Sequence, residues 1–189
     1  MFIHLQVLVV ACLPSTLSFD YSPCEYQQIP SENLYGISCL KGEPSDILEA
    51  FHRNSNNSEI NFLDIVFLND LTDDNLAEIL EVVAFASANV TRMAFMDLPK
   101  VEKVPAALQK FPKLNTLTIQ NTGITTIPSG SMVSPSHSYI SLYDNKKLTN
   151  IEVGAFQGCF SNSSATCSII SIHLKLFLFI NLFHLQYLR

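Results

Sequence analysis

The chain has 189 residues, which is enough for one domain with a sizeable core. Its hydrophobic content of 48% and its charged content of 15% argue against intrinsic disorder. The net charge of −6, with no basic stripe along the sequence, excludes nucleic acid as an expected partner.

Residues 1–18 have the pattern of a secretory signal peptide. An apolar stretch runs from Phe2 to Leu13, and the small residues Thr16 and Ser18 favour cleavage after Ser18. The alternative is a core strand at the N-terminus. The signal pattern predicts a secreted, extracellular protein.

The cysteines agree with this compartment. Cys12 lies within the predicted signal peptide, so four cysteines remain, and an even number allows three pairings. The local choice closes two short loops, Cys24–Cys39 and Cys159–Cys167. No C-x-x-C or Cys/His cluster is present, so no metal site is expected.

Three N-x-S/T sequons support secretion in combination with the signal and the cysteines. They predict N-glycosylation at Asn56, Asn89 and Asn162.

Residues 19–59 are expected to form an N-terminal cap. A strand at 36–39 would be tied back by Cys24 and would seal the first open edge of the core. A short helix should follow, with Ser45 as its N-cap and an apolar inner face of Ile47, Leu48 and Phe51.

Residues 60–158 fit the leucine-rich repeat template L-x-x-L-x-L-x-x-N-x-L. Four units begin at Ile60, Val90, Leu114 and His137. The L-x-L core of each unit alternates inward and outward, as a strand requires. In the last unit the ninth position is Asn145, whose amide can satisfy backbone groups where the chain leaves the strand; Thr122 is its weaker substitute in the third unit.

The connections between these units are predicted to differ. Apolar residues at helical spacing indicate a helix of about four turns over 73–88, with Thr72 or Asp73 at its start. The segment 129–138 is rich in Ser and Pro and should be a surface loop. The sequence thus predicts an α/β leucine-rich repeat solenoid, with parallel strands on a concave face, helical or irregular convex arms, about four repeats and a disulfide N-terminal cap.

Residues 159–189 form an apolar tail that allows four interpretations. It could continue as a fifth repeat from His173, cross a membrane as a helix over 168–189, act as a signal for a GPI anchor, or lie outside the mature fold because of a gene-model error. Polar residues are spread evenly through the tail, which favours the last interpretation or a poorly packed cap over membrane anchoring.

The chain resembles small extracellular leucine-rich repeat proteins of arthropods. The resemblance covers about residues 24–158 and rests on the Cys24 and Cys39 cap, the INFLDI strand with its helical arm, and the LNTLTIQNTGITTIP and SLYDNKKLTNIEVGAFQG units. More narrowly, it is similar to crustacean proteins related to the non-catalytic leucine-rich subunit of a shrimp luciferin monooxygenase. That resemblance implies binding or stabilising a partner rather than catalysis.

The outward strand positions are the candidate binding face, because aligning the four units stacks them in columns. The predicted ligand-binding residues are Phe62, Asp64, Arg92, Met96, Asp97, Thr118, Gln120, Tyr139, Tyr143 and Asp144. Asp97, Asn121 and Asp144 share one column, which could be a polar ladder or a weak cation site. Ordinary sheet surface is the alternative for every member of this set.

No catalytic motif is present, so neither an enzyme nor a cofactor is expected. His137 occupies a position that usually points inward, where a structural role is expected. The leading hypothesis is a secreted leucine-rich repeat protein that binds another protein through its concave face. The alternatives are a non-catalytic stabilising subunit of a secreted enzyme complex and a fragment of a membrane-anchored receptor.

Overall fold

The computed structural model describes residues 19–29, 34–87, 89–132, 139–156 and 168–170. The predicted signal peptide, Cys159, Cys167, Asn162 and His137 lie outside the described residues, as does the tail apart from 168–170. The assignments made for them remain predictions.

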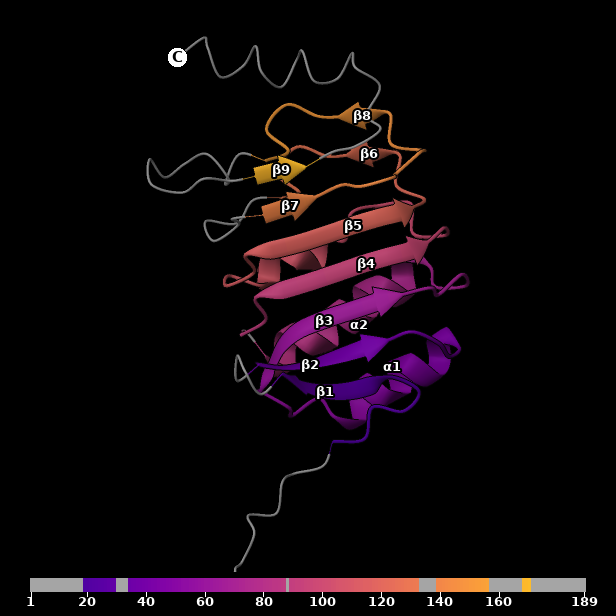
Figure 1. Cartoon of the computed structure of the whole chain (residues 1–189), viewed down its shortest axis with the longest axis vertical. Helices are drawn as coiled ribbons and strands as arrows, with labels where there is room; N and C mark the ends of the chain where they lie inside the picture. Colours follow the sequence, from indigo (N-terminus) through magenta and orange to yellow (C-terminus); the bar gives the residue numbers. More distant parts are fainter. Residues whose placement is uncertain (1–18, 30–33, 88, 133–138, 157–167, 171–189) are drawn as a thin grey trace, which may run out of the picture.

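A seven-stranded sheet runs through the molecule (Figure 1). Its strands, in spatial order, are β1 (Glu25–Ile29), β2 (Leu34–Cys39), β3 (Ile60–Val66), β4 (Arg92–Leu98), β5 (Thr116–Thr122), β7 (Tyr139–Ser141) and β9 (Ser168–Ile170). β1 pairs with β2 in antiparallel orientation, and the other neighbours run parallel. A second, two-stranded parallel sheet joins β6 (Thr126–Ile127) to β8 (Asn150–Ile151).

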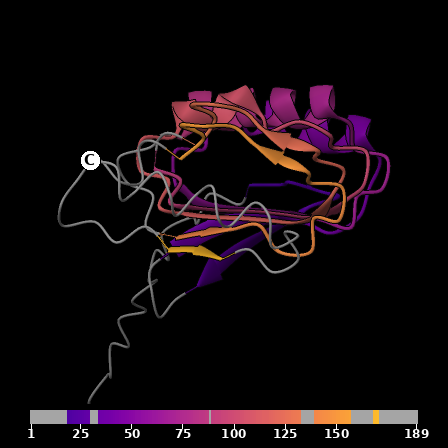
Figure 2. The same ribbon diagram turned by 90° about the horizontal axis from the view of Figure 1, so that it is seen from above.

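The helices all lie on one side of the large sheet (Figure 2). They are α1 (Pro44–Arg53), α2 (Asp73–Ala86) and the short 3₁₀ helix η1 (Ala106–Lys110). α2 packs against both α1 and η1. The result is a layer of helices over one face of the sheet, and no described helix lies on the opposite face.

The predicted leucine-rich repeat solenoid is therefore wrong as the description of this fold. The described residues form a mixed α/β structure with a mixed sheet and two α-helices, and a recurring strand-and-arm unit is not shown. α2 has 14 residues, η1 has five, and no helix stands between β5 and β7 in the described residues. The physical reason is that alternation of apolar residues specifies a strand and its inner face, but leaves the connection to the next strand undetermined.

The inward side chains of the parallel strands form the core between sheet and helices. The buried residues include Leu63 and Ile65 of β3, Met93 and Phe95 of β4, and Leu117, Ile119 and Ile140 further along. The helices contribute Ile47, Phe51, Leu76, Ile79, Leu80 and Val83. These are the positions that the apolar alternation and the helical spacing predict.

The N-terminal caps of the two α-helices were predicted from local sequence signals, with different outcomes. α2 begins as predicted: Thr72 is its N-cap, and the side chains of Thr72 and Asn75 bond each other's backbone N–H in a capping box. For α1 the predicted cap is wrong, because the helix begins at Pro44 with Glu43 as N-cap. Proline favours the first helical position because the N–H that it lacks would have no partner within the helix.

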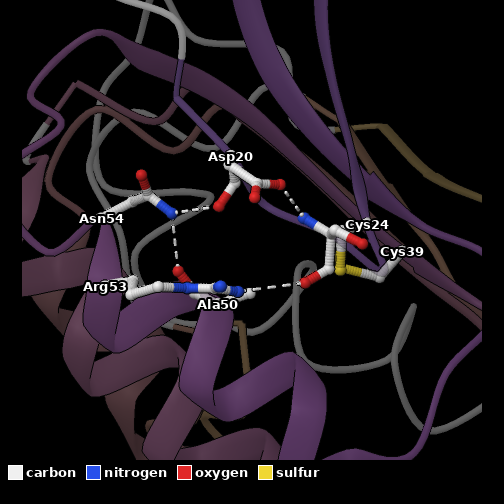
Figure 3. The surroundings of a disulfide bond; sticks show 7 residues. Asp20, Cys24, Cys39, Ala50, Arg53 and Asn54 are labelled. Atoms are coloured by element: carbon white, nitrogen blue, oxygen red, sulfur yellow. Dashed lines mark hydrogen bonds between the residues drawn. A yellow bond between two sulfur atoms is a disulfide. The ribbon is translucent and has the colours of Figure 1, made fainter.

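A disulfide joins Cys24 to Cys39, as the local pairing predicts, and ties the segment before β1 to the end of β2. Polar contacts from Arg53, the last residue of α1, and from Asn54, its C-cap, lie near it (Figure 3). The Asn54 side-chain amide donates to the carbonyl oxygens of Asp20 (2.6 Å) and Ala50 (2.8 Å), and Arg53 donates to that of Ser22 (3.3 Å). The start of the described chain is thus fixed to α1 by hydrogen bonds as well as by the covalent link to β2.

Within the described part of the chain, no helix has the length and apolar character that crossing a membrane requires.

Candidate protein-binding face

The face of the sheet that lies opposite the helices carries the predicted binding residues. Strand pairing places them in the predicted columns: Phe62, Arg92, Thr116 and Tyr139 follow one another across β3, β4, β5 and β7. A second column runs Asp64, Ala94, Thr118 and Ser141, and a third includes Val66, Met96 and Gln120.

Three of these residues make one cluster near β3 and β4. The Arg92 Nη2 donates to Asp64 Oδ2 at 3.0 Å, and the Arg92 guanidinium carbon lies 5.1 Å from the centre of the Phe62 ring. Such an arrangement combines an ion pair with a cation–π contact. The Asp64 side chain is 18% exposed and that of Arg92 is 48% exposed, so the guanidinium is the accessible part of the cluster.

Phe62 differs from the prediction because only 2% of its surface is exposed. Its neighbour across the β2–β3 pair is Gly36, and a Cβ on Gly36 would clash with the Phe62 ring. The missing side chain at Gly36 lets the ring lie flat against β2. The Phe62 ring therefore packs under the Arg92 guanidinium, and Phe62 itself is almost inaccessible to a partner protein.

The outward positions of β5 and the start of β7 are polar and uncharged. Thr116, Thr118, Gln120 and Tyr139 are all partly exposed and offer hydroxyl and amide groups. Tyr143 and Asp144 follow β7 and are also partly exposed. This composition suits hydrogen bonding to another protein.

A separate column at the C-terminal ends of the strands has an unusual backbone conformation. Phe67, Asp97, Asn121 and Asp144 have positive φ angles of 60°, 57°, 48° and 53°. The Asn121 side-chain amide donates to Asp97 Oδ1 at 2.6 Å, which favours the polar-ladder interpretation of this column. No group of three His, Cys, Asp or Glu residues that could hold a metal ion occurs in the described ranges.

Sequence reasoning did not select Phe67 or Leu40 as site residues, and the structure exposes both. Phe67 is 62% exposed and Leu40 is 47% exposed. They line a pocket of about 220 Å³ between the segment after β2 and the segment after β3. The signal that could have found Phe67 was its column, in which the other three members are Asp or Asn.

Two of the predicted glycosylation sites lie near each other, before the strands begin. Asn56 precedes β3, Asn89 precedes β4, and both are exposed. The Asn89 amide approaches the carbonyl oxygen of Ser58, the third residue of the Asn56 sequon, at 3.5 Å. The opposite ends of these strands carry Phe67 and Asp97.

Comparison with known proteins adds no relative: no family model matches the chain, and neither the curated proteins nor the solved structures contain a significant match.

Proposed function

We propose that this chain is an extracellular, non-catalytic module that binds another protein through the helix-free face of its large sheet. The observation that carries the proposal is that no described helix covers this face, on which Arg92 is exposed and Thr116, Thr118 and Gln120 are partly exposed, although Phe62, Val66, Ala94 and Ser141 are buried. Parallel strands normally occur in sheets that are covered on both sides, yet here no described helix covers the face with Arg92 and Thr118. A partner protein would cover the residues of this face that are exposed in the described part of the chain.

The chemistry of the face supports a protein as that partner. Arg92 is the basic residue in the predicted set, and its ion pair with Asp64 leaves little charge for binding phosphates. Tyr139 and Tyr143 are of a residue type that is enriched at protein interfaces. The neutral polar residues Thr116, Thr118 and Gln120 on the neighbouring strand β5 can bond to the main chain or side chains of a polypeptide.

The disulfide supports the extracellular part of the proposal. Structural disulfides persist in oxidising compartments and are rare in the cytosol. Cys39 is fully buried and Cys24 is 7% exposed, which fits a structural rather than a redox-active pair. The exposed sequons at Asn56 and Asn89 point to the same compartment.

The proposal can be tested with two matched threonine variants. Thr118→Arg places a long charged side chain in the centre of the face, whereas Thr125→Arg places the same side chain at an exposed position beside β6. Each variant and the wild type would be immobilised and exposed to the extracellular fluid of the source. The recovered proteins would be identified by mass spectrometry and then titrated as purified proteins.

We expect at least one partner that binds the wild type and Thr125→Arg equally well. The same partner should bind Thr118→Arg at least about tenfold more weakly. A long charged side chain that clashes with the partner at the centre of an interface costs on the order of 1.4 kcal/mol or more. The proposal fails if every purified partner binds all three proteins with the same affinity.

A further inference from the structure

Phe67 has a backbone conformation that its residue type does not favour. Asp97, Asn121 and Asp144 share its column and its positive φ, and Asp and Asn tolerate the left-handed region because their short side chains bond locally. A phenylalanine gains nothing comparable at φ 60° and carries a steric cost. Folding alone would be better served by Asn at this position.

The Phe67 ring does not compensate for this cost by burial, since 62% of the residue is exposed. Leu40 stands beside the same pocket and is 47% exposed. The pocket of about 220 Å³ is smaller than the roughly 300–1,000 Å³ of typical small-molecule sites, and suits a single side chain. An exposed aromatic residue beside a pocket of this size has the form of a docking contact between proteins.

The charges at the pocket fit a surface that is complementary to itself. Lys41 and Glu43 line the pocket, are exposed, and form no ion pair with any described residue. Asp70, also in the lining, is already bonded to Lys100 at 2.6 Å. A two-fold axis through the pocket would bring Lys41 of each copy to Glu43 of the other. The dimer would then contain two symmetry-related Lys41–Glu43 ion pairs.

We propose that the occupant of this pocket is a second copy of the chain, and that the protein forms a two-fold symmetric dimer through it. The Phe67 ring of each copy packs against Leu40 in the pocket of the other, and Lys41 and Glu43 pair across the axis. The contact lies where β2 and β3 end, so the columns around Thr118 stay free. The dimer is therefore independent of the proposed partner-binding face, and the Thr118→Arg variant should dimerise like the wild type.

Sedimentation equilibrium of the purified chain over a range of concentrations tests the dimer. We expect the wild type to approach twice the monomer mass with a dissociation constant below about 1 mM. Phe67→Asn should weaken the dimer about thirtyfold, the loss typical of a central hot-spot residue. The matched control is Phe85→Gln, which removes an aromatic residue of α2 that is 87% exposed and does not line the pocket, and should leave the dimer unchanged.

A charge exchange provides a second test that does not depend on Phe67. Lys41→Glu alone and Glu43→Lys alone should each be monomeric, because like charges then meet across the axis. An equimolar mixture of the two single variants should form a heterodimer, since the two acidic side chains of one variant then face the two basic side chains of the other. The proposal is overturned if the wild type keeps the monomer mass at about 1 mM, if Phe67→Asn dimerises like the wild type, or if the mixture stays monomeric.

Discussion

Asn145 binds Thr122 through a single amide oxygen that accepts two hydrogen bonds. Oδ1 lies 3.0 Å from the Thr122 backbone nitrogen and 2.8 Å from its Oγ1. The amide nitrogen donates to the carbonyl oxygens of Ile119 (2.8 Å) and Tyr143 (3.2 Å). One buried side chain thus serves backbone groups of both β5 and the segment after β7, the role predicted for it from its place in the sequence pattern.

Replacing Asn145 with Ala should destabilise the fold by about 2–4 kcal/mol. Several buried polar groups would lose their partners, and each such loss costs about 1–3 kcal/mol. The measurement is urea unfolding. Asn150→Ala, at an exposed position in β8, is the matched control and should change the free energy of unfolding by less than about 0.5 kcal/mol. Equal losses in the two variants would contradict the role assigned to Asn145.

Replacing Phe67 with Asn should raise the stability of the monomer by about 1 kcal/mol. The substitution relieves the steric cost of positive φ and removes an exposed apolar side chain. Unfolding should be measured at a concentration where the wild type is monomeric. Phe85→Gln is the control, because it also replaces an exposed Phe by an amide side chain but at a helical position, where no positive φ is relieved. A Phe67→Asn variant that is less stable than the wild type would show that the ring contributes more to the fold than its exposure suggests.

Replacing Gly36 with Ala should cost about 1–3 kcal/mol, because the new methyl group meets the Phe62 ring. Phe62→Leu replaces that ring with a smaller, more flexible side chain. If the clash is the cause, the double variant should lose less stability than the sum of the two single variants. A full double-mutant cycle by denaturant unfolding gives the coupling energy between the two positions. If the two losses are strictly additive, the Phe62 ring is not the cause of the destabilisation by Gly36→Ala.

Stability should fall in alkaline solution as Tyr21 ionises. Burial, with Tyr26 nearby, raises the pKa of Tyr21 from its ordinary 10.0 to about 12, and burial also raises the pKa of Tyr26. The unfolded chain releases the Tyr21 proton first, so this contribution is fully present below pH 10 and is lost as the pH rises through about 12. The loss attributable to Tyr21 should reach about 2–3 kcal/mol.

Unfolding free energies measured from neutral pH up to this range test the effect. Tyr21→Phe cannot ionise and should show a smaller alkaline decrease, with the remainder assigned to Tyr26. The explanation is wrong if the variant and the wild type lose the same stability.

Replacing both Cys24 and Cys39 with Ser should destabilise the chain by about 3 kcal/mol, the loop-closure value for a separation of about 15 residues. Adding reductant to the wild type should produce a similar decrease in the unfolding midpoint. An unchanged midpoint in reductant would mean that the hydrogen bonds from Asn54 and Arg53 hold this region on their own.

The strands and the start of α2 could be predicted because their signals are local. Leu63 and Ile65 alternate with outward residues, and Thr72 caps the helix three residues before its bonding partner Asn75. The antiparallel strand β1 was not predicted, since its EYQQI sequence carries no apolar alternation and its pairing depends on β2.

The candidate face could be predicted only in part, for a similar reason. Strand register follows from the apolar pattern, so the columns of outward residues could be predicted from the sequence. The burial of Phe62 depends on a glycine in another strand, and the exposure of Phe67 depends on where two connecting segments run. The solenoid prediction failed on those connecting segments as well, because strand periodicity does not encode them.

Strand direction gives the molecule two unlike ends. Because β3 and β4 run parallel, Asn56 and Asn89 both lie before the strands, while Phe67 follows β3 and Asp97 lies near the end of β4. Carbohydrate attached at the two asparagines would cover one end and leave the other bare. A protein that approached from the end of Asn56 and Asn89 would be blocked by carbohydrate, whereas the end with Phe67 and Asp97 would remain accessible. Glycosylation would then restrict the direction of approach without any contact to the binding residues.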